Sequence, residues 1–170
     1  MSIVLNDIER PQKRTDAPAT PSSGGGDPDG LFAHLRNDAS RRSAMDEAEQ
    51  QYKRGLALGE AGDIDGCIAA LQAASQAPTL RFMTASLLAR IFRDRGLNRQ
   101  AVEWFETAAQ APAPTAEEGH ALLYDLADAL EREGEIARAL AVSLELQADA
   151  GDYRDVSARI KRLTRVQARG

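Results

Sequence analysis

The side chains of this sequence that most readily do chemistry are two histidines and one cysteine. His34 and His120 lie far apart, and neither has a second metal ligand at the short spacing of a zinc site. His120 with Glu117 or Glu118 could mimic a catalytic site, although an ordinary surface helix explains the same pattern. Cys67 has no cysteine partner for a disulfide or a metal cluster. We therefore expect no metal and no cofactor.

Acidic residues and glycines give no better catalytic pattern. Glu131, Glu133 and Glu135 crowd the end of a predicted surface helix, too close together for a separated acid–base pair. The glycines at 24–26 follow no predicted strand and lack the Lys-Ser/Thr ending of a phosphate-binding loop. The sequence thus predicts a protein that is not an enzyme and has no small-molecule substrate.

The composition indicates a globular protein with a core of small apolar residues. The 170 residues are 43% hydrophobic but only 5% aromatic, so Ala and Leu must supply most of the burial. No apolar run reaches the roughly 18 residues that span a bilayer, and residues 1–10 do not resemble a secretion signal. The net charge of −5 disfavours bulk binding of nucleic acid. We expect a cytoplasmic protein, and the excess of arginine over lysine is typical of GC-rich bacterial genomes.

Residues 1–30 differ from the rest of the chain. Four prolines and a Ser/Gly-rich run break any regular element and offer little to bury, which predicts a disordered tail. An apolar group near the start of the tail is a candidate docking motif, either for the chain's own groove or for another protein: Ile3, Val4, Leu5 and Ile8. The alternative is an inert N-terminus.

Helical signals fill the rest of the chain. Residues 31–46 read as a linker with a short helix around Leu31, Phe32 and Leu35, and a cap at Ser43 predicts the next helix from Ala44. Beyond that point Gly or Pro falls at regular intervals, and no alternating β-branched run occurs. The spacing predicts an all-α chain with helices at 44–61, 64–77, 80–95, 98–110, 115–133, 136–149 and 152–167.

Three segments of the chain align with one another, beginning at Gly62, Gly96 and Gly134. These glycines lie 34 and then 38 residues apart, with the four extra residues around 111–115. Small residues recur where the two helices of each pair must cross closely. The recurring set comprises Gly55, Ala89 and Ala127 on the first helices, Cys67, Ala101 and Ala139 on the second, the larger Leu71 and Phe105, then Ala74 and Ala108, and finally Pro78 and Pro112.

This pattern resembles the tetratricopeptide repeat, a family of helix-turn-helix arrays. The resemblance implies a TPR-type α-solenoid over residues 47–168, with three repeats at about 48–79, 82–113 and 120–150 and a capping helix at 152–167. The third repeat departs from the pattern, because it has Ser143 and Leu146 in place of a large and a small residue and lacks the closing proline. The cap would bury one face through Val156, Ile160 and Leu163.

Tetratricopeptide arrays are scaffolds that hold a peptide or helix in a concave groove lined by the first helix of each repeat. Two tyrosines would anchor such a partner here, or would alternatively pack between repeats with their hydroxyls at the rim. The basic residues that grip a terminal carboxylate in one subgroup are absent. The resemblance places twelve residues in the groove: Glu49, Tyr52, Leu56 and Glu60; Met83, Ser86, Arg90 and Asp94; Ala121, Tyr124, Asp128 and Arg132.

The sequence therefore predicts a non-enzymatic adaptor in a bacterial multi-protein assembly, which captures a peptide or an amphipathic helix of a protein partner. One alternative is a secretion-type chaperone that shields a hydrophobic client. A less favoured one is that a basic C-terminal helix binds nucleic acid or an anionic membrane. Its basic residues are Arg154, Arg159, Lys161, Arg162, Arg165 and Arg169.

Overall fold

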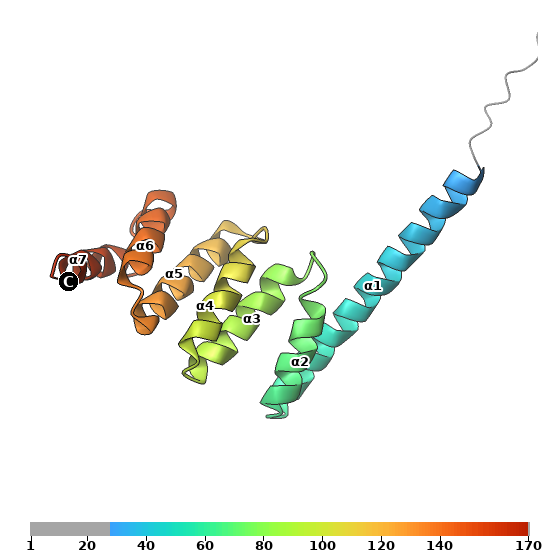
Figure 1. The fold of residues 1–170 in the computed structure, drawn as a ribbon, viewed down its shortest axis with the longest axis horizontal. Helices are drawn as coiled ribbons and strands as arrows, with labels where there is room; N and C mark the ends of the chain where they lie inside the picture. The colour runs from blue at the N-terminus through green and yellow to red at the C-terminus, as the bar shows by residue number, and fades with distance from the viewer. Residues whose placement is uncertain (1–27, 170) are drawn as a thin grey trace, which may run out of the picture. The chain divides into compact units, whose positions relative to one another are not determined.

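The computed structural model describes residues 28–169, in which every regular element is a helix. Consecutive helices from α2 onward pack against one another along the chain (Figure 1). No strand occurs in the described part, so the all-α class is confirmed. The helices are α1 (Pro28–Glu60), α2 (Ile64–Ala74), α3 (Arg81–Asp94), α4 (Asn98–Ala109), α5 (Ala116–Glu133), α6 (Ile136–Ala150) and α7 (Val156–Gln167).

The chain divides into two units, Met1–Arg36 and Asn37–Gly170, and the packed helical pairs belong to the second. Most of the predicted tail lies outside the described residues, as does the candidate docking motif at residues 3–8.

The turn inside each helical pair has the same geometry. Gly62, Gly96 and Gly134 all have positive φ, at 82°, 75° and 87°, a conformation that costs glycine little. In each turn the N–H of the next residue donates to a carbonyl five residues back, and all three N···O distances are 2.9 Å. These Schellman turns reverse the chain after α1, α3 and α5. The glycines found by aligning the sequence with itself therefore mark the same structural position.

Small residues allow the two helices of each pair to cross closely. A Cβ added at Gly55 would lie 3.0 Å from Cγ of Leu71, which is fully buried on α2. Ala89 and Ala127 occupy the matching positions of α3 and α5, and both are buried. The recurrent small and large positions of the second helices, from Cys67 to Ala139, are buried as well. The repeat read from the sequence is thus a pattern of packing positions.

The third pair fills its core differently. Ser143 stands where the first two pairs have Leu71 and Phe105, and it is fully buried. Its hydroxyl donates to the carbonyl of Ala139 at 2.7 Å, so the polar group costs little in the core. Leu146, also fully buried, supplies apolar volume one turn later.

The N-terminal helix is longer than the sequence pattern predicts. We expected a separate short helix near Leu31 and a new helix from Ala44, but α1 runs without a break from Pro28 to Glu60. That expectation was wrong because no Gly or Pro lies between residues 31 and 54, and a potential cap at Ser43 does not stop a run of good helix formers.

The last helix begins later than predicted, at Val156 instead of residue 152. Two positive φ angles, 67° at Gly151 and 50° at Arg154, form the connection that precedes it. Val156 and Leu163 are buried as expected for a cap, and Ile160 is half-buried.

Candidate functional site

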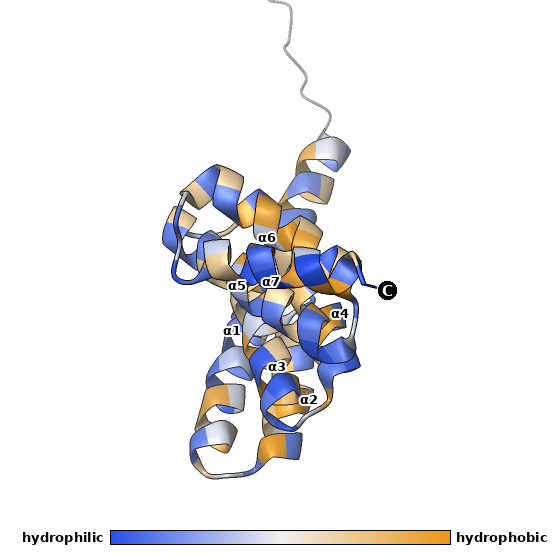
Figure 2. Ribbon diagram, turned by 90° about the vertical axis from the view of Figure 1, so that its left-hand side faces the viewer, coloured by the Kyte–Doolittle hydropathy of each residue, from blue (hydrophilic) through white to orange (hydrophobic). Residues whose placement is uncertain are grey.

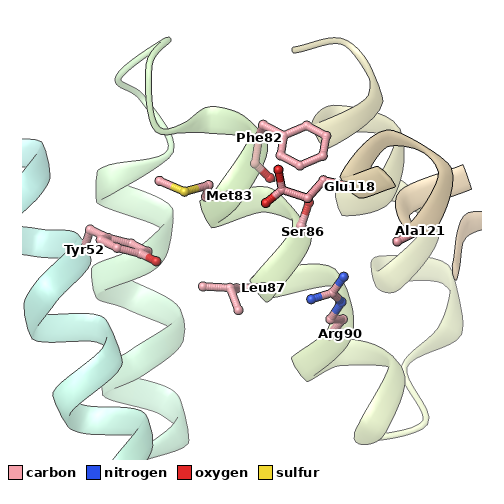
Figure 3. Close-up of a pocket in the computed structure, with 8 residues that line it drawn as sticks. All are labelled: Tyr52, Phe82, Met83, Ser86, Leu87, Arg90, Glu118 and Ala121. Atoms are coloured by element: carbon pink, nitrogen blue, oxygen red, sulfur yellow. The ribbon is translucent and has the colours of Figure 1, made fainter. Parts of the chain in front are cut away.

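A hollow of about 220 Å³ lies among the first helices of the three pairs, where the resemblance places a groove. Figure 3 shows Tyr52 of α1 with its ring directed towards Leu87 of α3, and Ala121 of α5 on the opposite side. Residues from three helices, far apart in the sequence, thus share one surface. The lining residues are Tyr52, Phe82, Met83, Ser86, Leu87, Arg90, Glu118 and Ala121.

Apolar and charged groups meet in this pocket. Tyr52, Met83 and Leu87 are half-buried and pack against the core, so each has surface left for a ligand. Arg90 and Glu118 bring opposite charges to the same hollow. Such a mixture suits an apolar side chain of a partner together with its polar backbone.

Glu118 is held in place by the helix that carries it. Thr115 is the N-cap of α5, and its hydroxyl oxygen accepts a hydrogen bond from the backbone N–H of Glu118 at 3.2 Å. The same hydroxyl donates to the Glu118 carboxylate at 2.9 Å. The residues 115–118 therefore satisfy the start of α5 and fix a carboxylate at the pocket.

Arg90 is fixed by a carboxylate of the next pair. Its Nε donates to Oδ2 of Asp125 at 3.2 Å, and Arg93 contacts the other oxygen of the same carboxylate at 3.1 Å. Asp125 is 17% exposed, whereas Arg90 is 44% exposed. This bridge ties α3 to α5, and it leaves part of the Arg90 guanidinium accessible.

Five of the twelve predicted groove residues line the pocket: Tyr52, Met83, Ser86, Arg90 and Ala121. Sequence reasoning missed Phe82, Leu87 and Glu118, although helical spacing could have found the last two. Leu87 lies four residues after Met83, and Glu118 three residues before Ala121, so each pair shares a helix face. Ser86 has little to offer a ligand, because it is buried and its hydroxyl donates to the carbonyl of Phe82.

The seven other predicted groove residues lie outside the pocket. On α1, Glu49, Leu56 and Glu60 are exposed. Two of the others are in ion pairs on their own helix: Asp94 pairs with Arg93, and Arg132 pairs with Asp128. The remaining two, Tyr124 and Asp128, contact α7.

Tyr124 packs between α5 and the start of α7. Its hydroxyl donates to Oδ1 of Asp155 at 2.6 Å, which raises the pKa of Tyr124 and lowers the pKa of Asp155. The guanidinium carbons of Arg154 and Arg159 lie 4.7 and 4.3 Å from the centre of its ring. Tyr153 meets the same ring edge-on at 6.2 Å. This tyrosine therefore matches the alternative of packing with its hydroxyl at the rim.

Arg159 is the main difference from the expected surface of α7. The sequence groups it with exposed basic residues, but it is only 4% exposed. Nη1 donates to the carbonyl of Tyr124 at 3.1 Å, and Nη2 pairs with Asp128 at 3.4 Å. Nε has no hydrogen bond, although Glu131 lies 3.9 Å away. Carboxylates of α5 hold this charge, and the sequence does not reveal them as partners.

The histidine singled out for its chemistry serves as a link between helices. Nε2 of His120 lies 2.7 Å from Oδ2 of Asp149 on α6, and its ring meets that of Tyr153 edge-on. Tyr153 in turn donates to Glu117 at 2.9 Å. No group of three metal-ligating side chains gathers anywhere in residues 28–169.

Cys67 lies at the close crossing of α1 and α2. It is 4% exposed, and burial raises the pKa of its thiol. The thiol is therefore a small apolar packing group and a poor nucleophile.

Comparison with known proteins agrees with this architecture. No protein-family model and no curated protein matches the sequence. Among the solved structures that match is the N-terminal domain of stress-induced protein-1 (STI-1) from C. elegans, at 12% identity and a TM-score of 0.61. The match covers 71% of this chain and 97% of that one. It shows the fold, which is that of a tetratricopeptide-type helical array, as the repeats in the sequence predicted. In the described part of the chain, no helix has the length and apolar character needed to cross a membrane.

Proposed function

We propose that this protein is a non-enzymatic adaptor that binds a peptide or an amphipathic helix of a partner protein at the pocket between α1, α3 and α5. The observation that carries the proposal is the convergence of Tyr52, Leu87 and Ala121, one from each first helix, on a single hollow. The adaptor would act within a bacterial, cytoplasmic multi-protein assembly.

The lining of the pocket supports an apolar anchor on the partner. Tyr52 offers a large contact area at low entropic cost, and Met83 can adapt its side chain to different shapes. Arg90 and Glu118 are already held by Asp125 and Thr115, so little ordering is needed when a ligand binds. A segment with one large apolar side chain, flanked by polar groups, meets these requirements.

The test is to block the pocket with one long side chain. A peptide selected from a random displayed library on the wild-type protein serves as the probe, and its Kd is measured by fluorescence anisotropy. We expect Ala121→Arg to weaken binding at least about tenfold, equivalent to about 1.4 kcal/mol. Ala141→Arg on the exposed side of α6 is the matched control and should leave the Kd unchanged.

Equal affinities for wild type and Ala121→Arg would contradict the proposal, provided that circular dichroism shows both variants to be folded. Equal losses in both variants would also contradict it, since the effect would then come from added charge and not from the pocket.

A further inference from the structure

The outer side of α7 carries a row of positive charge that forms no ion pair within the described residues. Lys161, Arg165 and Arg169 follow one another at four-residue steps, so successive charges lie about 6 Å apart along one side of the helix. Arg169 lies just past the helix end, where backbone hydrogen bonds continue the last turn. All three side chains are exposed, and no carboxylate in residues 28–169 pairs with them.

The opposite side of α7 packs against the array. Val156 and Leu163 are buried against the preceding helices, and Arg159 is buried on α5. Arg162, next to the row, is held by the Glu131 carboxylate at 2.8 Å and remains 52% exposed. In Figure 2 the ribbon of α7 accordingly alternates between strongly hydrophilic and hydrophobic bands. Like charges one turn apart repel each other, while the helix dipole favours Arg165 in the last turn of α7, so the two effects oppose each other and the row keeps its charge available to a ligand.

We propose that this row binds an acidic helical segment of a protein partner, with carboxylates repeating every fourth residue. Such a segment would present its charges at the same spacing of about 6 Å and pair with the row turn by turn, as charged flanking positions do between coiled-coil helices. This surface is separate from the pocket, whose lining residues come from α1, α3 and α5. It would give the protein a second, electrostatic contact.

Two other anionic ligands fit the observations less well. A membrane-bound amphipathic helix needs a broad free apolar face, but Val156 and Leu163 are buried in the array and leave Val166, 47% exposed, as the one large exposed apolar side chain of α7. Binding of nucleic acid is favoured by a basic protein and by aromatic side chains that stack on bases. This chain has a net charge of −5, and the sequence of α7 contains no aromatic residue.

The experiment measures binding of a labelled, alanine-based helical peptide with Glu at every fourth residue, by fluorescence anisotropy at low salt. A peptide with Gln in place of Glu is the ligand control. The row is neutralised in one triple variant, and a matched variant loses three exposed cations of α1 and α4, so both change the net charge equally. The two variants are Lys161→Gln/Arg165→Gln/Arg169→Gln and Lys53→Gln/Arg54→Gln/Arg99→Gln.

We expect the row variant to bind the acidic peptide at least about tenfold more weakly than wild type, and the matched variant to stay within about twofold. Affinity should fall as salt rises, and the Gln peptide should not bind. The pocket variant Ala121→Arg should bind the acidic peptide as wild type does, which separates this inference from the proposed function.

Equal binding by the row variant and wild type would overturn the proposal. So would tighter, row-dependent binding of a 20-base-pair DNA duplex or of vesicles containing phosphatidylserine, which would assign the row to nucleic acid or lipid. Salt-sensitive self-association that only the row variant loses, measured by sedimentation, would instead assign it to a second copy of the chain.

Discussion

Some side chains on the first helices join one helical pair to the next, whereas others face the pocket. Asp125 takes up Arg90 and Arg93, and Tyr124 is held by Asp155 and two arginines. Tyr52 has no such partner among the described residues and faces the pocket. The two tyrosines, which the repeat pattern makes equivalent, therefore differ in what they can offer a ligand.

The Tyr124–Asp155 hydrogen bond should make stability depend on pH. We expect Tyr124→Phe to lower the free energy of unfolding by roughly 0.5–1.5 kcal/mol at pH 7. Because the pKa of Asp155 is lowered in the folded state, its contribution is complete above its unfolded pKa of about 3.9. The contribution is lost as the pH falls through the lower, folded value. The difference between wild type and variant should therefore shrink below about pH 4.

At alkaline pH the contribution of the hydrogen bond is lost as the pH rises, because Tyr124 is the group that then loses its proton. The pKa of Tyr124 is raised, so its contribution holds below about pH 10 and is lost as the pH rises through the folded value. Urea unfolding of both proteins from pH 2.5 to 10.5 measures the effect, with Tyr52→Phe as the control. A difference that stays constant below pH 4 would show that the Asp155 carboxylate is not the partner that matters.

The sequence correctly predicts the packing of residues whose contacts lie within one helical pair. Gly55, Cys67 and Leu71 lie within a single hairpin, so their spacing alone defines the crossing. The sequence does not predict the burial of Arg159, because the carboxylates that hold it lie about thirty residues earlier in the chain. A lone arginine in a basic stretch gives no sign of such distant partners.

At the scale of helices, the distance between α1 and α2 depends on one missing side chain. We expect Gly55→Leu to overpack this crossing and lower the free energy of unfolding by roughly 1–3 kcal/mol, since the new atoms meet the buried Leu71. Ala57→Leu, on the exposed side of the same helix, should change stability by less than about 0.5 kcal/mol. Urea denaturation monitored by circular dichroism measures both, and similar effects would refute a close crossing.

Helix existence was predicted well and helix starts less well. The ends of α1, α3 and α5 are set by glycine turns, and the sequence marks them. The start of α1 is ambiguous in the sequence, because Pro28 suits both a turn and a first helical position, and the cap pattern at Ser43 lies inside the helix. The start of α7 depends on Arg154, whose positive φ goes with its contacts to the rings of Tyr124 and Tyr153.

At the scale of the whole array, α7 covers the end of the third pair. Deleting residues 152–170 removes the buried side chains of Val156 and Leu163, each of which contributes roughly 1.5–3 kcal/mol by burial. It also leaves Asp128 and Glu131 without Arg159. We expect a loss of about 3–6 kcal/mol in the free energy of unfolding, measured by urea titration.

Deleting only residues 168–170, beyond the end of α7, is the control and should leave the urea midpoint unchanged. An unchanged midpoint in the longer deletion would mean that the third pair needs no cap. The pocket between α1, α3 and α5 lies away from the deleted segment, so any loss of binding of the selected probe peptide should follow loss of stability.

The four residues by which the second repeat exceeds the first lie in the loop at 111–115, outside every helix. The packing of the neighbouring helices therefore does not require a loop of one fixed length here. Pro112 and Ala113 are exposed there, as insertion sites in proteins usually are. A fluorescent reporter or an affinity handle spliced between these two residues would travel with the folded array, which makes this loop the natural place from which to track the protein in cells.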